Sequence, residues 1–251
     1  MIDRPPSVSE KSGPPEGEVH VWRVALDRIS PSAEDLGSCL SADEQMRAEQ
    51  LSAPLERRRF ILSRIVLRHV LAGYHGTAAA QVPLAREPGG RPFLQGAGRL
   101  FFSLSHSGDT AVIAVADVDV GVDVERVRPV PRAAGIARRI LHPDTVAALE
   151  ALPQRRYEAA FLDAWTQREA HVKAVGGGLF RTADALPFDP LQPADATVRS
   201  VLSRDGLPWS VARFLPYHAT RASLAAPGVL RAVRIMDWLA GMPETTGEGN
   251  G

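Results

Sequence analysis

The residues of this chain best suited to chemistry are two carboxylates separated by a single residue. Asp123 and Glu125 lie in segment 120–127, Val-Gly-Val-Asp-Val-Glu-Arg-Val, whose alternation predicts a strand. Side chains alternate along a strand, so both carboxylates point to one face. They repel each other unless water or a cation screens them, and a hard, oxygen-seeking cation such as Mg2+ suits this arrangement. A half-buried strand with a solvated polar face is the more common explanation of such alternation, so this pattern alone does not decide.

A second group of functional side chains lies on a helix predicted over residues 155–175. Trp165, Glu169 and Lys173 follow one another at intervals of four and therefore share one helix face. Lys173 is one of only two lysines in the chain, and the other, Lys11, lies in a Pro/Gly/Ser-rich segment. An ammonium group can shift its pKa and transfer a proton, which a guanidinium in practice cannot do. The alternative is a surface Glu–Lys pair, which contributes about 0.3–0.5 kcal/mol.

Basic side chains that could bind an anion are concentrated in the first half of the chain. Residues 41–100 hold nine basic groups and five acidic ones, although the formal charge of the whole chain is zero. His106 follows at the end of a predicted strand, where a ring nitrogen can face an anion. These features indicate a phosphate site that faces the carboxylates. A solvated helix face and a turn histidine without a ligand are the alternatives.

Composition excludes several classes of protein. The single cysteine, Cys39, excludes a disulfide scaffold and a cysteine-rich metal site. The balanced charge argues against a general nucleic-acid binder. The chain has no apolar run of about 20 residues and no secretory signal, so we expect a cytoplasmic protein without a membrane partner. The sequence contains no Walker loop, zinc spacing, nucleophile elbow or dinucleotide fingerprint.

Turn signals and hydrophobic periodicity predict an α+β fold in which helices and an antiparallel sheet occur twice. Strands are predicted at 19–26, 100–106, 110–118, 120–127, 196–204, 208–215, 219–225 and 229–238. Helices are predicted to begin after a capping box at Ser41 and to cover 55–74, 131–141, a segment from 143, and 155–175. We therefore expect a disordered tail at 1–17, an N-terminal α+β half at 18–118, a C-terminal α+β half carrying the metal site at 119–241, and a disordered tail at 242–251.

Four motifs in a fixed order are more specific than any of them alone. They are Gly-Arg-Pro at 90–92, Phe-Ser-Leu-Ser-His-Ser-Gly-Asp at 102–109, Val-Gly-Val-Asp-Val-Glu at 120–125, and Trp-Thr-Gln-Arg-Glu-Ala-His-Val-Lys-Ala-Val-Gly-Gly-Gly-Leu at 165–179. Together they resemble the 4′-phosphopantetheinyl transferases. The chain length and the Trp-x-x-x-Glu-x-x-x-Lys form are similar to the Sfp-type branch and not to the short trimeric holo-acyl-carrier-protein synthases. The resemblance implies a monomer built as a pseudo-dimer of two similar halves, with the active site in the cleft between them.

The resemblance also implies a reaction. The phosphopantetheine arm of coenzyme A would move to a serine of an acyl- or peptidyl-carrier protein, releasing 3′,5′-ADP, in polyketide, nonribosomal-peptide or fatty-acid biosynthesis. Asp123, Glu125 and Glu169 would hold Mg2+, with Mn2+ as the alternative, on the pyrophosphate of coenzyme A. Glu169 or a metal-bound water would take the serine proton. Lys173 would steady the pyrophosphate or the leaving group.

Further positions match residues that contact coenzyme A in this family. They are Arg91, Ser105 and His106, with His106 near the 3′-phosphate, and Arg47 in the early helix. One position departs from the family pattern, because Arg168 stands before Glu169 where the family usually has Lys. Arginine keeps the charge and can bind phosphate, so we expect activity with altered geometry.

Two other functions remain open at the level of sequence. A Mg2+-dependent phosphohydrolase could share the acidic cluster and would consume coenzyme A or nucleotides without a carrier protein. A catalytically silent protein could bind carrier domains regardless of coenzyme A and Mg2+. Retention of Asp123, Glu125, Glu169 and Lys173 argues against the silent protein, which has no need for this set.

Overall fold

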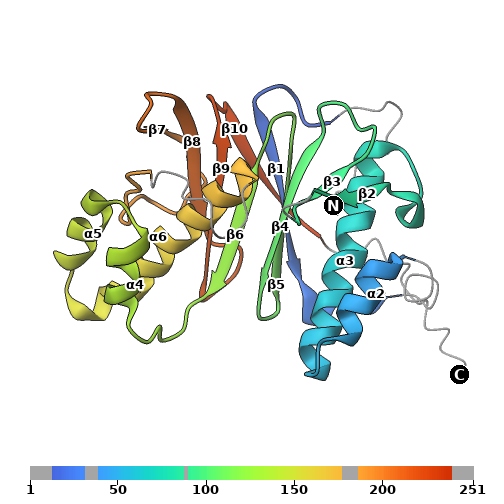
Figure 1. Cartoon of the computed structure of the whole chain (residues 1–251), viewed down its shortest axis with the longest axis horizontal. Helices are drawn as coiled ribbons and strands as arrows, with labels where there is room; N and C mark the ends of the chain where they lie inside the picture. Colours follow the sequence, from blue (N-terminus) through green and yellow to red (C-terminus); the bar gives the residue numbers. More distant parts are fainter. Residues whose placement is uncertain (1–12, 32–38, 88–89, 177–185, 239–251) are drawn as a thin grey trace, which may run out of the picture.

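Two four-stranded sheets form the centre of the molecule, and helices lie on the outer side of each (Figure 1). The computed structural model describes residues 13–31, 39–87, 90–176 and 186–238. The first sheet contains, in spatial order, β10 (Ala232–Asp237), β1 (Glu18–Ala25), β5 (Thr110–Ala116) and β4 (Phe101–Ser107). The second contains β6 (Gly121–Arg126), β9 (Thr220–Pro227), β8 (Pro208–Phe214) and β7 (Arg199–Leu202). The predicted α+β class is confirmed, whereas the pseudo-dimer and its cleft stay predictions.

The helices begin and end where local sequence signals place them. Ser41 caps α2 (Ala42–Glu49) through the predicted capping box with Glu44. Proline at the first position opens α3 (Pro54–His75), and Gly76, in the left-handed conformation at φ 72°, ends it. The remaining elements are α4 (Ala133–Ile140), α5 (Pro143–Glu150), α6 (Gln154–Val175), the short strands β2 (Leu84–Arg86) and β3 (Pro92–Leu94), and the 3-10 turns Leu26–Arg28 and Ala79–Gln81.

Alternation along the strands divides the core into layers. In β1, Trp22 and Val24 pack into the cluster formed with α3, whereas Val19 and Val21 pack between the two sheets. Val122 and Val124 of β6 enter the same cluster from the second sheet. The two sheets therefore share one apolar layer, and the helices α4, α5 and α6 lie on the far side of the second sheet (Figure 1).

The last strand crosses from the second half of the chain to the first sheet. Strand β10 pairs in parallel with β1, with Glu18 opposite Ala232 and Arg23 opposite Asp237. The sequence predicted this strand but placed it in the 119–241 half. The predicted division after residue 118 therefore does not describe β10, and the division as a whole stays a prediction. Pairing between strands so far apart in sequence leaves no local signal.

Part of the predicted N-terminal tail belongs to the fold. Residues 13–17 are described, Pro14 is buried, and the carbonyl of Gly17 accepts a hydrogen bond from the amide of Arg231 at 2.7 Å. Residues 1–12 and the tail predicted at 242–251 lie outside the described residues. Among the helices that are described, none has the length and hydropathy needed to cross a membrane.

Candidate active site

Strand β6 brings its two carboxylates against helix α6. Gly121, Asp123 and Glu125 share one face of β6, and a Cβ atom at Gly121 would lie 1.9 Å from the backbone oxygen of Ala170. Glycine at this position is therefore what allows the strand and the helix to approach so closely. Asp123 is buried and Glu125 half-buried. The predicted strand and the shared face of the two carboxylates are both observed.

Lys173 reaches from α6 across to the same face of β6. Its ammonium group donates to Oδ1 of Asp123 at 2.7 Å and to the carbonyl of Val122 at 3.1 Å. The other oxygen of Asp123, Oδ2, is buried and has no hydrogen-bond partner. A buried carboxylate oxygen without a partner is costly unless something else compensates its charge. Asp123 therefore has one oxygen that is satisfied by protein and one that has no partner among the described residues.

Glu169 lies one helical turn before Lys173 and pairs with its own neighbour in sequence. Its Oε1 is 2.5 Å from Nη1 of Arg168, whose Nε also donates to the carbonyl of Ile140 at 3.2 Å. Burial raises the pKa of Glu169 above its usual value, Arg168 opposes that shift, and the negative charge of Asp123 adds to it. Arg168, where the family usually has Lys, thus ties Glu169 to the end of α4.

Glu125 is held from two sides. The hydroxyl of Ser107 donates to its Oε2 at 2.9 Å, and the guanidinium of Arg128 lies 3.8 Å from the same oxygen. Burial raises the pKa of Glu125, the bond from Ser107 opposes this, and Asp123 raises it further. The charge of Asp123 therefore acts on both glutamates.

The three carboxylates fit a magnesium ion in donor type but are not gathered around one point. Within the described residues, no group of three or more His, Cys, Asp or Glu side chains is placed to hold a metal ion. Carboxylate oxygens are the ligands that Mg2+ prefers, and the unpartnered Oδ2 of Asp123 is a free one. In the structure, Asp123 contacts Lys173, Glu125 is hydrogen-bonded to Ser107, and Glu169 is paired with Arg168.

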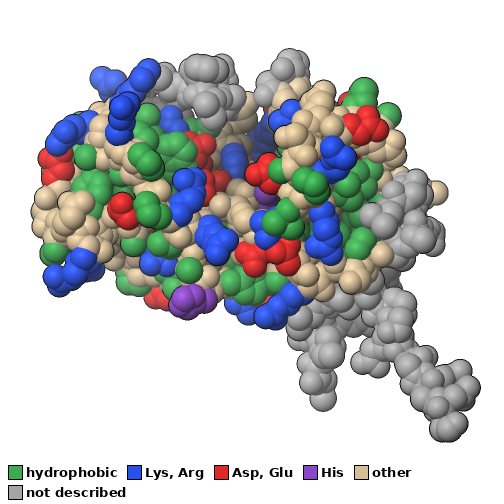
Figure 2. Space-filling view, turned by 90° about the horizontal axis from the view of Figure 1, so that it is seen from below, with side chains coloured by type: hydrophobic (Ala, Val, Ile, Leu, Met, Phe, Trp, Pro, Cys, Tyr) green, Lys and Arg blue, Asp and Glu red, His purple; other side chains and the backbone are tan. Residues whose placement is uncertain are grey.

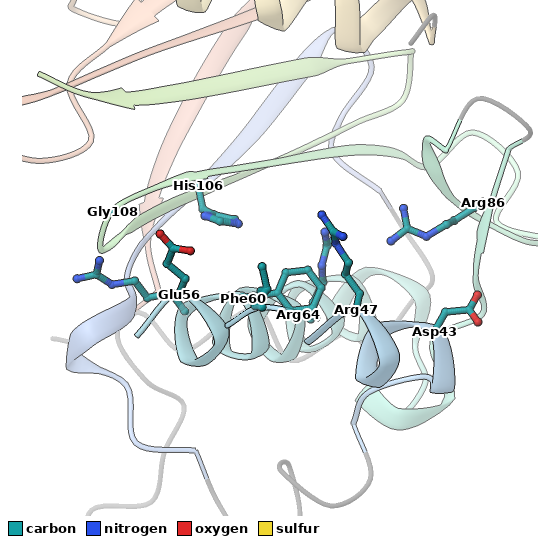
Figure 3. A pocket seen from close by; sticks show the side chains of 10 residues that line it. Asp43, Arg47, Glu56, Phe60, Arg64, Arg86, His106 and Gly108 are labelled. Atoms are coloured by element: carbon teal, nitrogen blue, oxygen red, sulfur yellow. The ribbon is translucent and has the colours of Figure 1, made fainter. Parts of the chain in front are cut away.

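A pocket of about 690 Å3 opens between α3, α2 and the end of β4 (Figure 3). We call it the arginine pocket, because four arginines and a histidine line it: Arg47, Arg59, Arg64, Arg86 and His106. The guanidinium of Arg64 lies 5.0 Å from the ring centre of Phe60, and its Nε is buried without a hydrogen-bond partner. Arg59 is paired with Asp27, so Arg64 is the pocket arginine with an unpartnered nitrogen among the described residues. A positive group of this kind at the wall of a pocket is suited to binding an anion.

Two of the residues predicted to contact coenzyme A, Arg47 and His106, meet in the arginine pocket. Partial burial at the wall lowers the pKa of His106 below its usual value, and the positive charges of Arg64, Lys173 and Arg59 lower it further. His106 follows Ser105 on β4, and Ser105 bonds to Asp123, so the pocket and the Asp123–Lys173 pair flank the same strand. In the sequence, Arg64 and Arg86 stand out only as part of the basic surplus of residues 41–100. Arg64 lies on α3 and Arg86 on β2, so their convergence depends on how these elements pack.

The other two predicted contacts, Arg91 and Ser105, point elsewhere. Arg91 pairs with Asp119 at 2.7 Å and donates to the carbonyl of Ala174 at 3.4 Å, near the end of α6. Ser105 precedes His106 on β4, so strand alternation turns its hydroxyl to the opposite face, where it bonds to Asp123. Their contacts with coenzyme A stay predictions.

Figure 2 shows a face of the molecule that is hollowed between its two lobes, with positive and negative side chains gathered around the hollow. All residues that line the arginine pocket come from segment 43–108, whereas the carboxylates come from β6 and α6. The candidate site thus combines basic groups from one half of the chain with carboxylates from the other.

Comparison with known proteins identifies the family. Residues 119–225 match the model of the 4′-phosphopantetheinyl transferase superfamily, and residues 29–118 match that of the 4′-phosphopantetheinyl transferase N-terminal region. The chain is 32% identical over 232 residues to the 4′-phosphopantetheinyl transferase HetI of Nostoc sp., an alignment that covers 90% of this chain and 93% of the relative. The chain belongs to the 4′-phosphopantetheinyl transferase family.

Further relatives agree with this assignment. The transferase psf-1 of Bacillus pumilus is 32% identical over 166 residues, which cover 66% of this chain and 70% of that protein. A 4′-phosphopantetheinyl transferase of Bacillus subtilis is 25% identical over 171 residues, covering 67% and 73%. The resemblance stated from the four motifs is confirmed, the Sfp-type branch fits, and the protein is a phosphopantetheinyl transferase type of enzyme.

Proposed function

We propose that this enzyme transfers the 4′-phosphopantetheine arm of coenzyme A to a serine of an acyl- or peptidyl-carrier protein, with Mg2+, and releases 3′,5′-ADP. The observation that carries the proposal is the Asp123–Lys173 pair, in which Oδ2 of Asp123 has no partner among the described residues. Ser105, which bonds to Asp123, is followed directly on β4 by His106 in the wall of the arginine pocket. Family membership supplies the class of reaction, and this arrangement supplies groups for each part of the substrate.

The arginine pocket would hold the phosphates of coenzyme A. Arginine and protonated histidine form short, charge-assisted hydrogen bonds with phosphate oxygens, and four arginines can share several such groups. Arg64 is already fixed over Phe60 with an unpartnered Nε, so little side-chain entropy would be lost when it binds. The 3′-phosphate would lie against Arg47 and His106, and the site as a whole would occupy the junction of the two halves.

Asp123, Glu125 and Glu169 would hold the magnesium ion. When bound there, the ion would neutralise charge on the pyrophosphate oxygens as the bond to the leaving group breaks. Lys173 would supply a second positive charge on the same side, since its ammonium group already lies on Asp123. Binding the pyrophosphate would then require that Lys173 share its donors between the carboxylate and the phosphate.

Glu169 would accept the proton of the attacking serine. In this reaction the serine oxygen bonds to the phosphorus that carries the pantetheine arm, the bond from that phosphorus to the bridging oxygen breaks, and 3′,5′-ADP leaves. A general base works best when its pKa is near the working pH, and burial raises the pKa of Glu169 in that direction. The attacking nucleophile belongs to the carrier protein, so the enzyme needs none of its own.

The intact mass of an apo carrier protein tests this function. After incubation with enzyme, coenzyme A and Mg2+, the carrier is expected to gain about 340 Da, the mass of one phosphopantetheine group, and EDTA is expected to abolish the gain. Glu169→Gln is expected to slow transfer by about 100-fold or more, because it removes the base and also weakens one of the proposed magnesium ligands. Glu158→Gln, an exposed carboxylate on the same helix, is the matched control and should transfer at the parental rate.

The remaining outcomes separate the alternatives. Coenzyme A that is cleaved without a carrier adduct would support a phosphohydrolase. Carrier binding that ignores coenzyme A and Mg2+, with no gain in mass on polyketide, nonribosomal-peptide or fatty-acid carriers, would support a silent binder. Either result would contradict the proposed transfer.

A further inference from the structure

Strand β4, at the edge of the first sheet, and strand β6, at the edge of the second, are joined through serine side chains and not by backbone–backbone hydrogen bonds. Ser103, Ser105 and Ser107 alternate along β4 on the face turned toward the second sheet, and we call them the serine ladder. Their hydroxyl oxygens accept the amides of Val122 at 3.1 Å, Val124 at 3.3 Å and Arg126 at 3.1 Å. These amides lie on the edge of β6 that does not pair with β9, so the serine ladder satisfies donors that an edge strand would otherwise leave open.

Each hydroxyl of the serine ladder still has one proton to donate. Ser105 donates it to Oδ1 of Asp123 at 2.8 Å, and Ser107 donates it to Oε2 of Glu125 at 2.9 Å. Both serines thus accept from one β6 residue and donate to the carboxylate of the residue before it. Ser103 follows the same spacing, but the residue before Val122 is Gly121, which has no side chain. The ladder therefore has two steps that hold a carboxylate and one that holds none.

This arrangement determines which oxygen of Asp123 is free. Oδ1 receives hydrogen bonds from both Ser105 and Lys173, whereas Oδ2 is buried and receives none. A hydroxyl that is itself fixed by a backbone amide can donate only within a narrow range of directions. These hydrogen bonds thereby fix the orientation of the Asp123 carboxylate relative to β6.

We propose that Ser105 and Ser107 are positioning residues that orient Asp123 and Glu125, and that Ser105 keeps Oδ2 of Asp123 free as a cation ligand. The identity of the cation as Mg2+ rests on the proposed function. This role is separate from the predicted contact of Ser105 with coenzyme A, because the single hydroxyl proton of Ser105 is donated to Asp123 and its side chain points away from the arginine pocket. Groups that orient metal-binding carboxylates change metal affinity by about 10- to 100-fold when they are removed.

The ladder supplies its own control for the test. Ser103→Ala and Ser105→Ala each remove one acceptor for a β6 amide, at side chains that are 7% and 9% exposed. Only Ser105→Ala also removes a hydrogen bond to a carboxylate. We expect both variants to lower the melting temperature in EDTA, and Ser105→Ala to lower it further because it also removes the hydrogen bond to Asp123. In a titration of the full chain with Mn2+ as the probe, followed by electron paramagnetic resonance with and without coenzyme A, Ser105→Ala should bind about 10- to 100-fold more weakly, and Ser103→Ala should stay within about twofold of the parent.

A second pair of variants keeps the test decisive. Ser105→Thr retains the hydroxyl and should restore most of the Mn2+ affinity. If Ser105→Ala does not fold, Ser107→Ala at the half-buried end of the ladder tests the same role on Glu125. Parental Mn2+ affinity in Ser105→Ala, or an equal loss in Ser103→Ala, would overturn the proposal.

Failure of the proposed function would look different. Absence of carrier modification by the parent, together with Mn2+ affinity that depends on Ser105, would reject the transfer reaction and retain the positioning role. Normal transfer by the parent, together with Mn2+ affinity that is unchanged in Ser105→Ala, would retain the transfer reaction and reject the positioning role.

Discussion

At the scale of single residues, the surroundings of each titratable group determine what it can do. His106 lies at the wall of a pocket whose other cations are arginines, so partial burial and neighbouring positive charge both lower its pKa. The lowered pKa favours the neutral ring in the free protein. A phosphate beside it reverses the local charge and raises that pKa, so binding of the anion and protonation of the ring favour each other.

Coenzyme A binding is accordingly expected to take up a proton at His106. Affinity should rise as the pH falls from 8 to 6, because the bound-state pKa lies above that of the free protein. His106→Gln should cost about tenfold in affinity at pH 6 and little at pH 8. Calorimetry in two buffers of different ionisation enthalpy measures the proton uptake. His218→Gln, an exposed turn histidine, is the control, and the same pH dependence in both variants would contradict the assignment.

Local patterns in the sequence predict the positions of many residues of this site, whereas the positions of the others depend on tertiary packing. Alternation was enough to place Asp123 and Glu125 on one face, and the four-residue spacing was enough to align Glu169 and Lys173. Alternation also separates Ser105 from His106, although the family motif groups them as coenzyme A contacts. The meeting of Arg64 with Arg86, or of Ser105 with Asp123, depends on how distant strands and helices pack, and no local pattern encodes that.

At the scale of elements, the candidate site depends on the contact between β6 and α6. Lys173 of α6 reaches Asp123 only because Gly121 lets the strand pack directly on the helix backbone. A Cβ atom added at Gly121 would lie 1.9 Å from the oxygen of Ala170 and 2.6 Å from the nitrogen of Ala174. Neither neighbour is a flexible side chain that could move aside. The sequence shows a glycine within a strand, but the reason for it appears only in the packed pair.

Gly121→Ala should therefore displace α6 and weaken both stability and catalysis. We expect a loss of about 3 kcal/mol in the free energy of unfolding, together with transfer slowed about 100-fold as Lys173 moves relative to Asp123. Urea denaturation and the carrier mass assay measure the two effects. Gly135→Ala in α4, where an added Cβ meets nothing within 4 Å, should instead stabilise by about 0.5–1 kcal/mol. Equal changes in unfolding free energy and in transfer rate for the two variants would contradict a role for the close contact between Gly121 and α6.

At the scale of the whole molecule, the two halves of the chain are tied together by its last strand as well as by the serine ladder. Strand β10 covers the edge of β1 that faces away from β5, and Trp238 just beyond it lies edge-on against Trp22 of the first core, with ring centres 6.2 Å apart. Arg23 pairs with Asp237 at 2.6 Å along the same edge. The strand itself was predictable from its alternation, but its partner lies more than 200 residues away in sequence, and pairing at that separation follows from the global arrangement of the sheets.

Removal of β10 should consequently destabilise the first sheet more than the second. A chain that ends at Leu230 keeps this buried side chain between the sheets but loses the parallel ladder to β1 and the contact with Trp22. Several net hydrogen bonds and one aromatic pair together amount to about 3–5 kcal/mol. Urea denaturation should show this loss, and hydrogen exchange should quicken in β1 before β8. A chain that ends at Trp238 is the control and should match the parent. Unchanged exchange in β1 of the shorter chain would mean that the first sheet is complete without β10, and that the remaining contacts between the halves, among them the serine ladder and the shared apolar layer, are sufficient to hold them together.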